Sequence, residues 1–360
     1  MSKKLMFYIN TLETGGAERV MSQLASHFQQ RGYAVTLVTS YPSQGEYPLD
    51  EGIRRIYLQP EKLHGSRLMR NIKLINGLRR ICRQENPSLL ISFMQEPNFR
   101  AILATIGLPI KTVVSVRNDP NREYAGIVGR VVGKCLLPLA DGCVFQTEQA
   151  KAWFPRKLQK KSKIIFNEVS NTVFDVVRHS PQHIVTLGRL TPQKNHALLI
   201  RAFAKIADKY PDQNLLIYGK GDKKEALEAQ IRDLGMADRA LLMGVTTDVP
   251  AILSRAGIFV LSSDYEGMPN ALMEALAAGV PSISTDCPCG GPQMLIRNGE
   301  NGLLVPVGDV EAMTSAMDQL LSEPQLAEKL GLAARESARQ YLPENIATQW
   351  EKYLLQVVEK

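Results

Sequence analysis

The stretch SSDYEGMPN, residues 262–270, lies between an apolar run, Ile258–Leu261, and the helix-forming run ALMEALAA, residues 271–278. The apolar run is typical of a buried parallel strand. Pro269 suits an early helical position, where its missing N–H costs nothing, and Gly279 predicts the end of the helix. The sequence therefore predicts a strand, a polar loop and a helix. Such a loop presents N–H groups and a positive helix end to an anionic or hydroxyl-rich ligand.

Two carboxylates frame this loop. Glu266 lies within it, and Glu274 follows in the predicted helix, 274 − 266 = 8 positions later. A carboxylate accepts hydrogen bonds from two neighbouring hydroxyls, so Glu274 suits a ribose diol and Glu266 suits a sugar. The spacing alone leaves equally open that both acids are solvated side chains of an ordinary helix.

The residues around these acids resemble a known motif. The run EGMPNALME, from Glu266 to Glu274, resembles the paired-glutamate motif of the retaining family-4 (group 1) glycosyltransferases, and AGVP, residues 278–281, continues the likeness. The resemblance implies an α/β chain with the GT-B fold: two facing Rossmann-like doubly wound domains with a cleft between them. It also implies transfer of a hexose or N-acetylhexosamine from a UDP-sugar to a glycan, with retention at the anomeric carbon, in bacterial surface-polysaccharide or glycan assembly.

Size and composition agree with a protein of two domains. The chain has 360 residues, of which 44% are hydrophobic and 22% charged, as in soluble globular proteins. The short apolar run near the N-terminus is followed at once by polar residues, which predicts a first strand instead of a signal peptide and a cytoplasmic protein. The cysteines are odd in number and mostly lie in apolar segments, which indicates reduced buried thiols without a metal or redox role: Cys82, Cys135, Cys143, Cys287 and Cys289.

Strands and helices alternate along the chain, which favours parallel sheets. We expect a first domain over residues 1–170, a second over 171–340, and a final helix over 341–360 that crosses back to the first domain. The predicted strands are 5–9, 34–39, 53–58, 89–93, 112–116 and 143–145, followed by 184–187, 215–218, 241–243, 258–261, 282–284 and 303–305.

A pair of basic residues follows the first strand of the predicted second domain. Arg189 and Lys194 lie in a turn, GRLTPQKN, that begins at Gly188 and opens a helix at His196. Breaking the glycosidic bond of a sugar nucleotide leaves negative charge on the diphosphate, which a cation must neutralise. The chain has no Asp-x-Asp pair to hold a metal, so we expect the Arg fork and the Lys ammonium to replace it. The alternative is a surface turn without function; the family resemblance gives the pair its phosphate-binding role.

The resemblance assigns further residues and also meets two departures. A Gly-Gly-Ala-Glu-Arg loop, preceded by Thr14, resembles the family loop that faces the donor phosphates and the acceptor, and the turn at Gly219 resembles the glycine turn beside the nucleotide. Some relatives carry a histidine where this chain has Arg117 and Asn118, for which a ligand contact and a structural role are equally open. The family often has a glutamate at the place of Gln293.

The site expected from the sequence contains three groups of residues and no covalent nucleophile. The catalytic group is Arg189, Lys194 and Glu266. The group that binds the donor or its nucleotide is Gly15, Gly16, Gly188, Gly219, Gly267, Met268, Pro269, Asn270 and Glu274. The group with a possible acceptor or donor contact is Glu18, Arg117 and Asn118. We expect no metal and no cofactor, with the UDP-sugar acting as substrate.

The charge distribution suggests a partner. The net charge is +7, and the predicted helix over residues 66–83 interleaves Arg and Lys with Leu68, Ile72, Ile75, Leu78 and Ile81. A solvated basic face and attraction to an anionic membrane surface have equal weight. The second reading predicts a peripheral protein on the inner membrane face and a lipid-linked acceptor such as a polyprenyl-diphosphate oligosaccharide. Nucleic acid is disfavoured because no aromatic-rich surface accompanies the charge.

Other functions remain open on the same fold. A UDP-sugar epimerase would need no acceptor, a glycan phosphorylase would need inorganic phosphate, and a non-catalytic protein would bind the sugar nucleotide without cleaving it. An oxidoreductase is disfavoured because neither half has a dinucleotide-binding glycine fingerprint.

Overall fold

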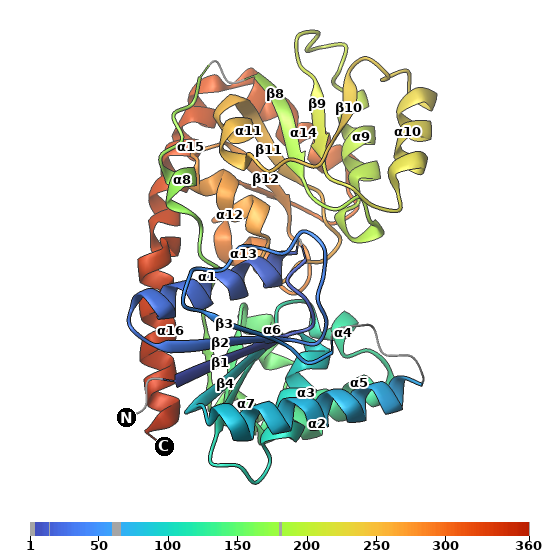
Figure 1. Cartoon of the computed structure of the whole chain (residues 1–360). Helices are drawn as coiled ribbons and strands as arrows, with labels where there is room; N and C mark the ends of the chain where they lie inside the picture. Colours follow the sequence, from blue (N-terminus) through green and yellow to red (C-terminus); the bar gives the residue numbers. More distant parts are fainter. Residues whose placement is uncertain (1–3, 14, 60–65, 180–181, 360) are drawn as a thin grey trace. The chain divides into compact units, whose positions relative to one another are not determined.

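The protein forms two compact units in the computed structural model, which describes residues 4–13, 15–59, 66–179 and 182–359 (Figure 1). The first unit comprises Met1–Asn167 and Glu344–Lys360, and the second comprises Glu168–Pro343. The division at 167/168 and 343/344 lies beside the expected limits of 170 and 340. Met1–Lys3, Thr14 of the glycine loop, and Ser180 and Pro181 of the connector lie outside the described residues.

A seven-stranded parallel sheet forms the centre of the first unit, in the order β3-β2-β1-β4-β5-β6-β7. Its strands are β1 (Lys4–Ile9), β2 (Ala34–Thr39), β3 (Arg54–Tyr57), β4 (Leu89–Phe93), β5 (Lys111–Ser115), β6 (Gly142–Phe145) and β7 (Ser162–Ile164). The connecting helices are α1 (Gly16–Gln30), α2 (Arg67–Glu85), α3 (Gln95–Thr105), α4 (Pro120–Glu123), α5 (Gly126–Val131), α6 (Glu148–Ala152) and α7 (Arg156–Gln159). The sequence analysis did not predict β7, whose three residues are too few to show a pattern.

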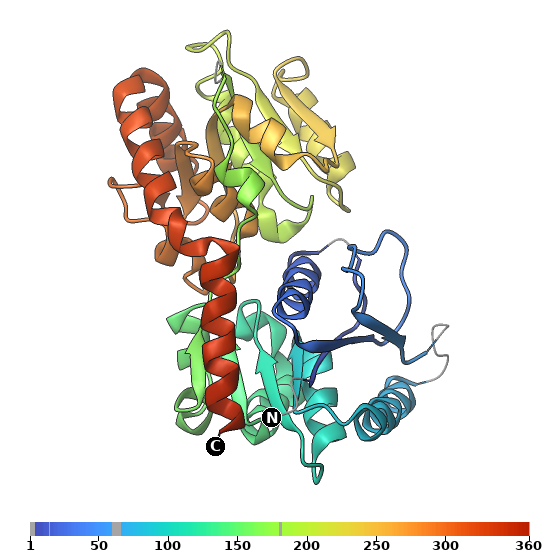
Figure 2. The same cartoon turned by 60° about the vertical axis from the view of Figure 1, so that its left-hand side comes forward.

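The last helix, α16 (Pro343–Val358), packs in the core of the first unit (Figure 2). Its buried side chains, among them Trp350, join the cluster formed by β1, β4 and α1. The Trp350 ring stacks on Phe93 with 5.8 Å between the ring centroids. On its outer side, Glu351 accepts hydrogen bonds from Arg31 at 2.5 Å and from Tyr33 at 2.9 Å. The helix is therefore held by an apolar face and by a polar anchor.

The second unit contains a six-stranded parallel sheet in the order β10-β9-β8-β11-β12-β13. Its strands are β8 (Gln182–Leu187), β9 (Leu215–Tyr218), β10 (Ala240–Gly244), β11 (Ala256–Leu261), β12 (Ser282–Thr285) and β13 (Leu303–Val305). Its helices are α8 (Asn171–Phe174), α9 (His196–Ala204), α10 (Lys224–Asp233), α11 (Val249–Arg255), α12 (Asn270–Ala277), α13 (Gly291–Leu295), α14 (Val310–Ser322) and α15 (Pro324–Ala338).

These two sheets confirm the predicted α/β class with Rossmann-like doubly wound domains. Four of the cysteines are buried and free, as expected, but Cys135 is exposed. It belongs to a short π-helical turn that follows α5, in which an apolar segment lies at the surface. None of the helices in the described ranges is both long and apolar enough to cross a membrane.

Candidate functional site

The predicted catalytic residues follow two neighbouring strands of the second unit. Strands β8 and β11 pair in parallel, and the strand order changes direction between them. Ligands of doubly wound sheets bind beyond the carboxyl ends of the strands at such a switch point. Arg189 and Lys194 follow β8, and Glu266 follows β11, so the fold brings the three residues to the same edge of the sheet.

Glu266 is the centre of this arrangement. Its Oε1 accepts a hydrogen bond from Lys194 Nζ at 2.5 Å and another from Ser263 Oγ at 2.6 Å. The side chains of Glu266 and Lys194 are 7% and 14% exposed. Gln193 donates to the Tyr265 carbonyl at 2.9 Å and lies 3.5 Å from Glu266 Oε2. The carboxylate is thus neutralised and oriented before any substrate binds, and its Oε2 has the weaker of the contacts.

Further hydrogen bonds join the two loops that carry these residues. The Asp264 amide donates to the Gln193 carbonyl at 2.9 Å, and Asn195 Nδ2 donates to Asp264 Oδ1 at 2.7 Å. The Ser262 hydroxyl donates to the Lys194 carbonyl at 2.9 Å. The segments 193–195 and 262–266 therefore form one tied structure. The sequence analysis did not assign these roles to Ser262, Gln193 and Asn195, although polar residues directly after a buried strand were a usable signal.

Glycines allow the surrounding backbone to pack closely. A Cβ on Gly291 would lie 1.8 Å from the Gly267 carbonyl oxygen, and a Cβ on Gly219, whose φ is +153°, would lie 1.9 Å from the Gly188 carbonyl oxygen. Any other residue would push these loops apart. The turn at Gly219 therefore lies against the turn that carries Arg189, as the predicted site requires.

The helix after the Glu266 loop differs from its prediction in one detail. α12 begins at Asn270, and Pro269 precedes it with φ −76° and ψ 102°, so Pro269 is the N-cap residue and not part of the first turn. Its ring fixes φ but leaves ψ free to be extended. Gly279, with φ +72°, follows the end of the helix as predicted. Met268 and Glu274 are only 7% and 6% exposed.

The basic turn has one exposed cation and one that is largely covered. Arg189 is exposed, whereas Lys194 closes a short 3-10 turn, Pro192–Lys194, and points to Glu266. His196, which begins α9 after Asn195, is 3% exposed. Burial, with a smaller contribution from the Lys194 charge, lowers the pKa of His196 to about 4. The imidazole is therefore neutral near pH 7 and adds no charge to the site.

The glycine loop of the first unit contains a carboxylate of its own. Gly15 is extended and Gly16 begins α1. A Cβ on Gly15 would lie 2.1 Å from Glu18 Oε2, so the Glu18 side chain bends back over the start of the helix. An acid in that position disfavours a phosphate and suits hydroxyl groups of a sugar. The roles predicted for Gly15, Gly16 and Glu18 stay predictions, and these residues belong to a different unit from Glu266.

Arg117 lies in the interior of the first unit and not on the surface of its loop. Its guanidinium lies 3.8 Å from the ring centre of Phe93, and Nη1 donates to Asn167 Oδ1 at 2.7 Å. Burial lowers the pKa of Arg117 to about 9. This placement favours the structural alternative for Arg117. Asn118 is half-buried, and its Oδ1 accepts from the Asp119 amide at 2.9 Å.

Within the described parts of the chain, His, Cys, Asp and Glu side chains do not gather in groups of three that could hold a metal ion. That the reaction uses no metal stays a prediction, which activity measurements with a chelator test.

Comparison with known proteins identifies the family. The model of group 1 glycosyl transferases matches residues 174–337, and that of glycosyltransferase family 4 matches residues 14–169. The protein is therefore a group 1 glycosyltransferase with the GT-B fold, and hence a transferase enzyme.

Individual relatives support this assignment. A glycosyltransferase of Haemophilus influenzae is 28% identical over 98% of this chain and 100% of its own length. The Campylobacter jejuni enzyme named GalNAc-α-(1→4)-GalNAc-α-(1→3)-diNAcBac-PP-undecaprenol α-1,4-N-acetyl-D-galactosaminyltransferase is 25% identical over 98% of this chain and 99% of its own. The crystal structure of Anabaena HepE in complex with UDP and glucose has a TM-score of 0.82, with 17% identity over 98% of this chain and 99% of that one. The homologues of this chain thus include a bacterial transferase named for a lipid-linked glycan acceptor, and the likeness to HepE shows the shared fold.

Proposed function

We propose that the protein transfers a hexose or an N-acetylhexosamine from a UDP-sugar to a lipid-linked glycan, with retention at the anomeric carbon and without a metal ion. The observation that carries the proposal is the Lys194–Glu266 pair beside the turn of Arg189. It combines fixed cations with an oriented carboxylate at the switch point of the second unit. The complex of HepE with UDP and glucose, and the undecaprenol-linked acceptor named for the Campylobacter enzyme, support this choice of donor and acceptor.

Each residue of the site has a defined task in this proposal. Arg189 and Lys194 bind the diphosphate and stabilise the charge that develops on it as the glycosidic bond breaks. An ammonium has three donors, and Glu266 uses one, so Lys194 can bind a phosphate oxygen without leaving Glu266. Glu266 Oε2 accepts from a hydroxyl of the donor sugar, and Glu274 accepts from the ribose hydroxyls. The leaving phosphate takes the proton of the acceptor hydroxyl on the same face of the sugar, which retains the anomeric configuration and needs no protein nucleophile.

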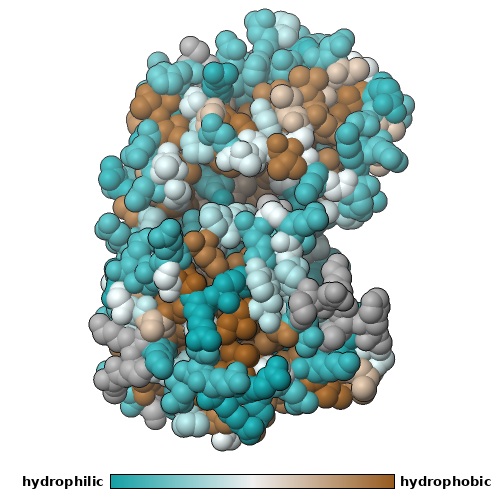
Figure 3. Space-filling model, in the orientation of Figure 1, coloured by the Kyte–Doolittle hydropathy of each residue, from teal (hydrophilic) through white to brown (hydrophobic). Residues whose placement is uncertain are grey.

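The surface of the first unit offers a place for a lipid-linked acceptor. Along α2, Leu74 and Leu78 are buried, but Leu68, Met69 and Ile72 are 70%, 53% and 45% exposed. The predicted apolar stripe is therefore split: its second half packs in the core and its first half faces outward among Arg67, Arg70 and Lys73. On the face shown in Figure 3, apolar patches lie between hydrophilic side chains, and a contiguous apolar patch at a surface can mark an interaction site.

The first unit has a second exposed apolar segment, helix α5. On α5, Ile127, Val128 and Val131 are 84%, 78% and 54% exposed. α2 starts beside the first turn of α3, because Arg67 pairs with Glu96 at 2.7 Å. The Gln95 amide of the same turn donates at 2.8 Å to Glu123, the last residue of α4, and α4 precedes α5 in the chain. Apolar side chains among basic ones suit an anionic membrane surface, where each basic residue contributes roughly 1 kcal/mol.

The donor chemistry is tested by UDP release from a panel of UDP-sugars with candidate acceptors added in turn. Arg189→Ala should lower turnover and UDP affinity together, whereas Glu274→Ala should mainly weaken UDP binding; Arg232→Met, an exposed cation of α10, is the matched control. Product NMR that shows an inverted anomeric centre would refute retention. Release that needs no acceptor but yields a second UDP-sugar would indicate an epimerase, and UDP binding without release from any donor would indicate a non-catalytic protein.

The membrane surface is tested by flotation with vesicles that contain or lack anionic lipid. Leu68→Asp and Val128→Asp should each reduce the fraction bound to anionic vesicles. Leu332→Asp, which changes a leucine of α15 that is 65% exposed in the second unit, should not. Equal binding of all variants, or binding that ignores anionic lipid, would contradict the proposal.

A further inference from the structure

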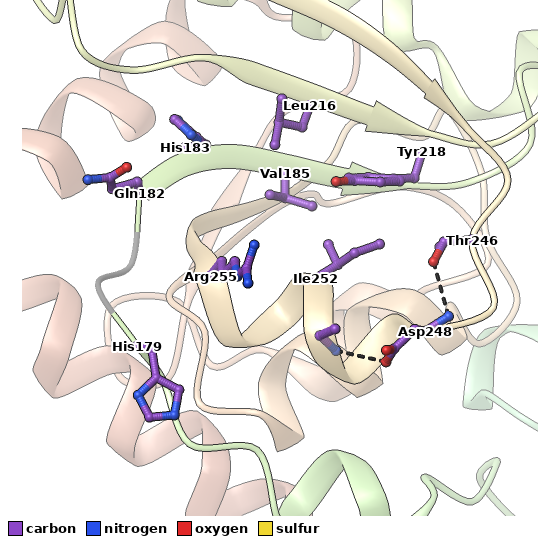
Figure 4. Close-up of a pocket in the computed structure, with 11 residues that line it drawn as sticks. His179, Gln182, His183, Val185, Leu216, Tyr218, Thr246, Asp248, Ile252 and Arg255 are labelled. Atoms are coloured by element: carbon purple, nitrogen blue, oxygen red, sulfur yellow. Dashed lines mark hydrogen bonds between the residues drawn. The ribbon is translucent and has the colours of Figure 1, made fainter.

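A cavity of about 790 Å³ lies in the second unit, between its sheet and α11 (Figure 4). Its floor is formed by Val185 of β8 and by Leu216 and Tyr218 of β9, and Ile252 of α11 faces them from the opposite side. Pockets that bind small molecules are typically about 300–1,000 Å³ and mainly apolar, with a few polar groups at fixed positions. The size and the floor of this cavity therefore suit a small molecule with an apolar body.

The polar lining of the cavity contains more basic than acidic side chains. Arg255, His179 and His183 line it together with a single acid, Asp248. The Asp248 carboxylate is already engaged, because its Oδ1 accepts from the Ala251 amide at 3.0 Å and caps α11 (Figure 4). No such engagement reduces the charge of Arg255, since within the described residues no carboxylate lies within ion-pair distance of it.

Two features indicate that the cavity is more than a gap in the packing. Tyr218 and Arg255 both line the cavity, so one ligand can contact a phenol and a guanidinium, and burial raises the pKa of Tyr218. His183 has φ +69°, a backbone conformation that non-glycine residues rarely adopt, and its buried Nδ1 has no hydrogen-bond partner in the described part of the chain. Strained residues and unpaired buried polar atoms concentrate at binding sites.

We infer that this cavity binds a planar, mainly apolar anion, with its ring against Tyr218 and Ile252 and its acidic group on Arg255. None of the residues that surround Glu266 lines the cavity, so the site is separate from the proposed donor site and goes beyond the proposed function. The two sites have a mechanical connection: the Gly188 amide, which starts the turn of Arg189, donates to the Tyr218 carbonyl at 2.9 Å. A ligand that orders Tyr218 would therefore also affect the phosphate-binding turn, through the hydrogen bond between the Tyr218 carbonyl and the Gly188 amide.

The test uses the dye 1-anilinonaphthalene-8-sulfonate, which has a fused ring and one sulfonate and fluoresces in apolar sites. Titration of the full-length folded protein should show saturable binding of one dye molecule. Arg255→Met should weaken binding about tenfold, the effect of one lost charge-assisted hydrogen bond. Ala251→Trp, which fills the cavity from α11, should abolish it. Arg232→Met on α10 removes an equivalent exposed cation outside the cavity and should change nothing.

Competition with UDP separates this inference from the proposed function. Excess UDP should not displace the dye, and Glu274→Ala should leave dye binding unchanged even if it weakens UDP binding. The inference is overturned if the dye does not bind, if binding does not saturate, if Arg255→Met and Ala251→Trp both bind it as the parent protein does, or if UDP displaces it. Loss of transferase activity in any assay would leave these outcomes unaffected.

Discussion

Substitution of Lys194 by Met removes the cation that neutralises Glu266 and keeps the length of the side chain. The Glu266 carboxylate, 7% exposed, would then be a buried charge held only by Ser263 and the long contact to Gln193. Removing one partner of a buried ion pair costs about 3–5 kcal/mol, and the remaining neutral donors favour the lower end of this range. At about 2–4 °C per kcal/mol for a domain of this size, Lys194→Met should lower the melting temperature of the second unit by roughly 6–12 °C.

A second substitution tests the cause of that loss. In Lys194→Met/Glu266→Gln the side chain at 266 carries no charge, and its amide oxygen can still accept from Ser263. Differential scanning calorimetry should therefore show that the double variant regains most of the stability, although we expect neither variant to release UDP because both lack the phosphate-binding Lys194. Lys209→Met, which breaks an exposed pair with Asp318, is the matched control and should melt close to the parent protein. The reasoning is wrong if Lys194→Met melts like the control, or if the double variant is no more stable than the single one.

Three further predictions follow from the structure. Gly291→Ala places a methyl group 1.8 Å from the Gly267 carbonyl oxygen, so it should displace the loop. Calorimetric titration should then show a UDP affinity at least about tenfold lower. Gly235→Ala, at a glycine with open space around it, is the control that tests backbone strain alone. The pKa of His196 is near 4 in the folded protein, against 6.5 in the unfolded chain, so below pH 6.5 the unfolded state binds more protons. The free energy of unfolding should therefore fall by up to about 3 kcal/mol between pH 6.5 and 4. A His196→Gln variant that keeps the same pH dependence would contradict this. EDTA should leave UDP release unchanged, and restoration of a lost rate by Mg²⁺ or Mn²⁺ would show that a metal takes part.

The fold was predictable because long parallel strands leave a strong pattern. β2, β4, β9 and β13 have the predicted limits, and the other predicted strands differ at their ends by one or two residues. Such runs are apolar on both faces, and the glycines and polar residues after them mark the loops. β7 (Ser162–Ile164) was not predicted, because this three-residue strand at the edge of the sheet has two polar side chains and no alternation of polar and apolar residues. The exposure of the apolar side chains in the first half of α2 was also not predicted. The helical period shows which residues share a face, but not how far the core extends beneath that face.

The candidate site divides in the same way between what a sequence shows and what only a structure shows. Lys194 and Glu266 could be predicted to share one edge of the sheet because each follows a buried strand, whereas the tying roles of Ser262, Gln193 and Asn195 were not predicted. Arg117 was not, because a loop position after a strand does not reveal whether the side chain turns outward or, as here, inward onto Phe93. The bend of Glu18 over Gly15 is equally a matter of rotamer and space.

The pairing of Lys194 with Glu266 has a consequence for catalysis that neither residue has alone. A lone Lys beside a diphosphate also interacts with the bound donor, and only the part of its attraction that grows as the bond breaks lowers the barrier. With Glu266 on one of its donors, part of the ammonium's charge is offset in the ground state. As charge grows on the departing phosphate, the remaining donors of Lys194 interact with it more strongly, while Glu266 keeps the ammonium from turning away. The pair therefore stabilises the transition state, in which the glycosidic bond is breaking, more than it stabilises the bound donor. The Glu266→Gln variant, whose side chain carries no charge, should bind the donor nearly as well as the parent protein but turn it over more slowly. Comparison of kcat and KM for this variant and the parent protein measures that difference, and a change confined to KM would show that the carboxylate only helps the donor to bind.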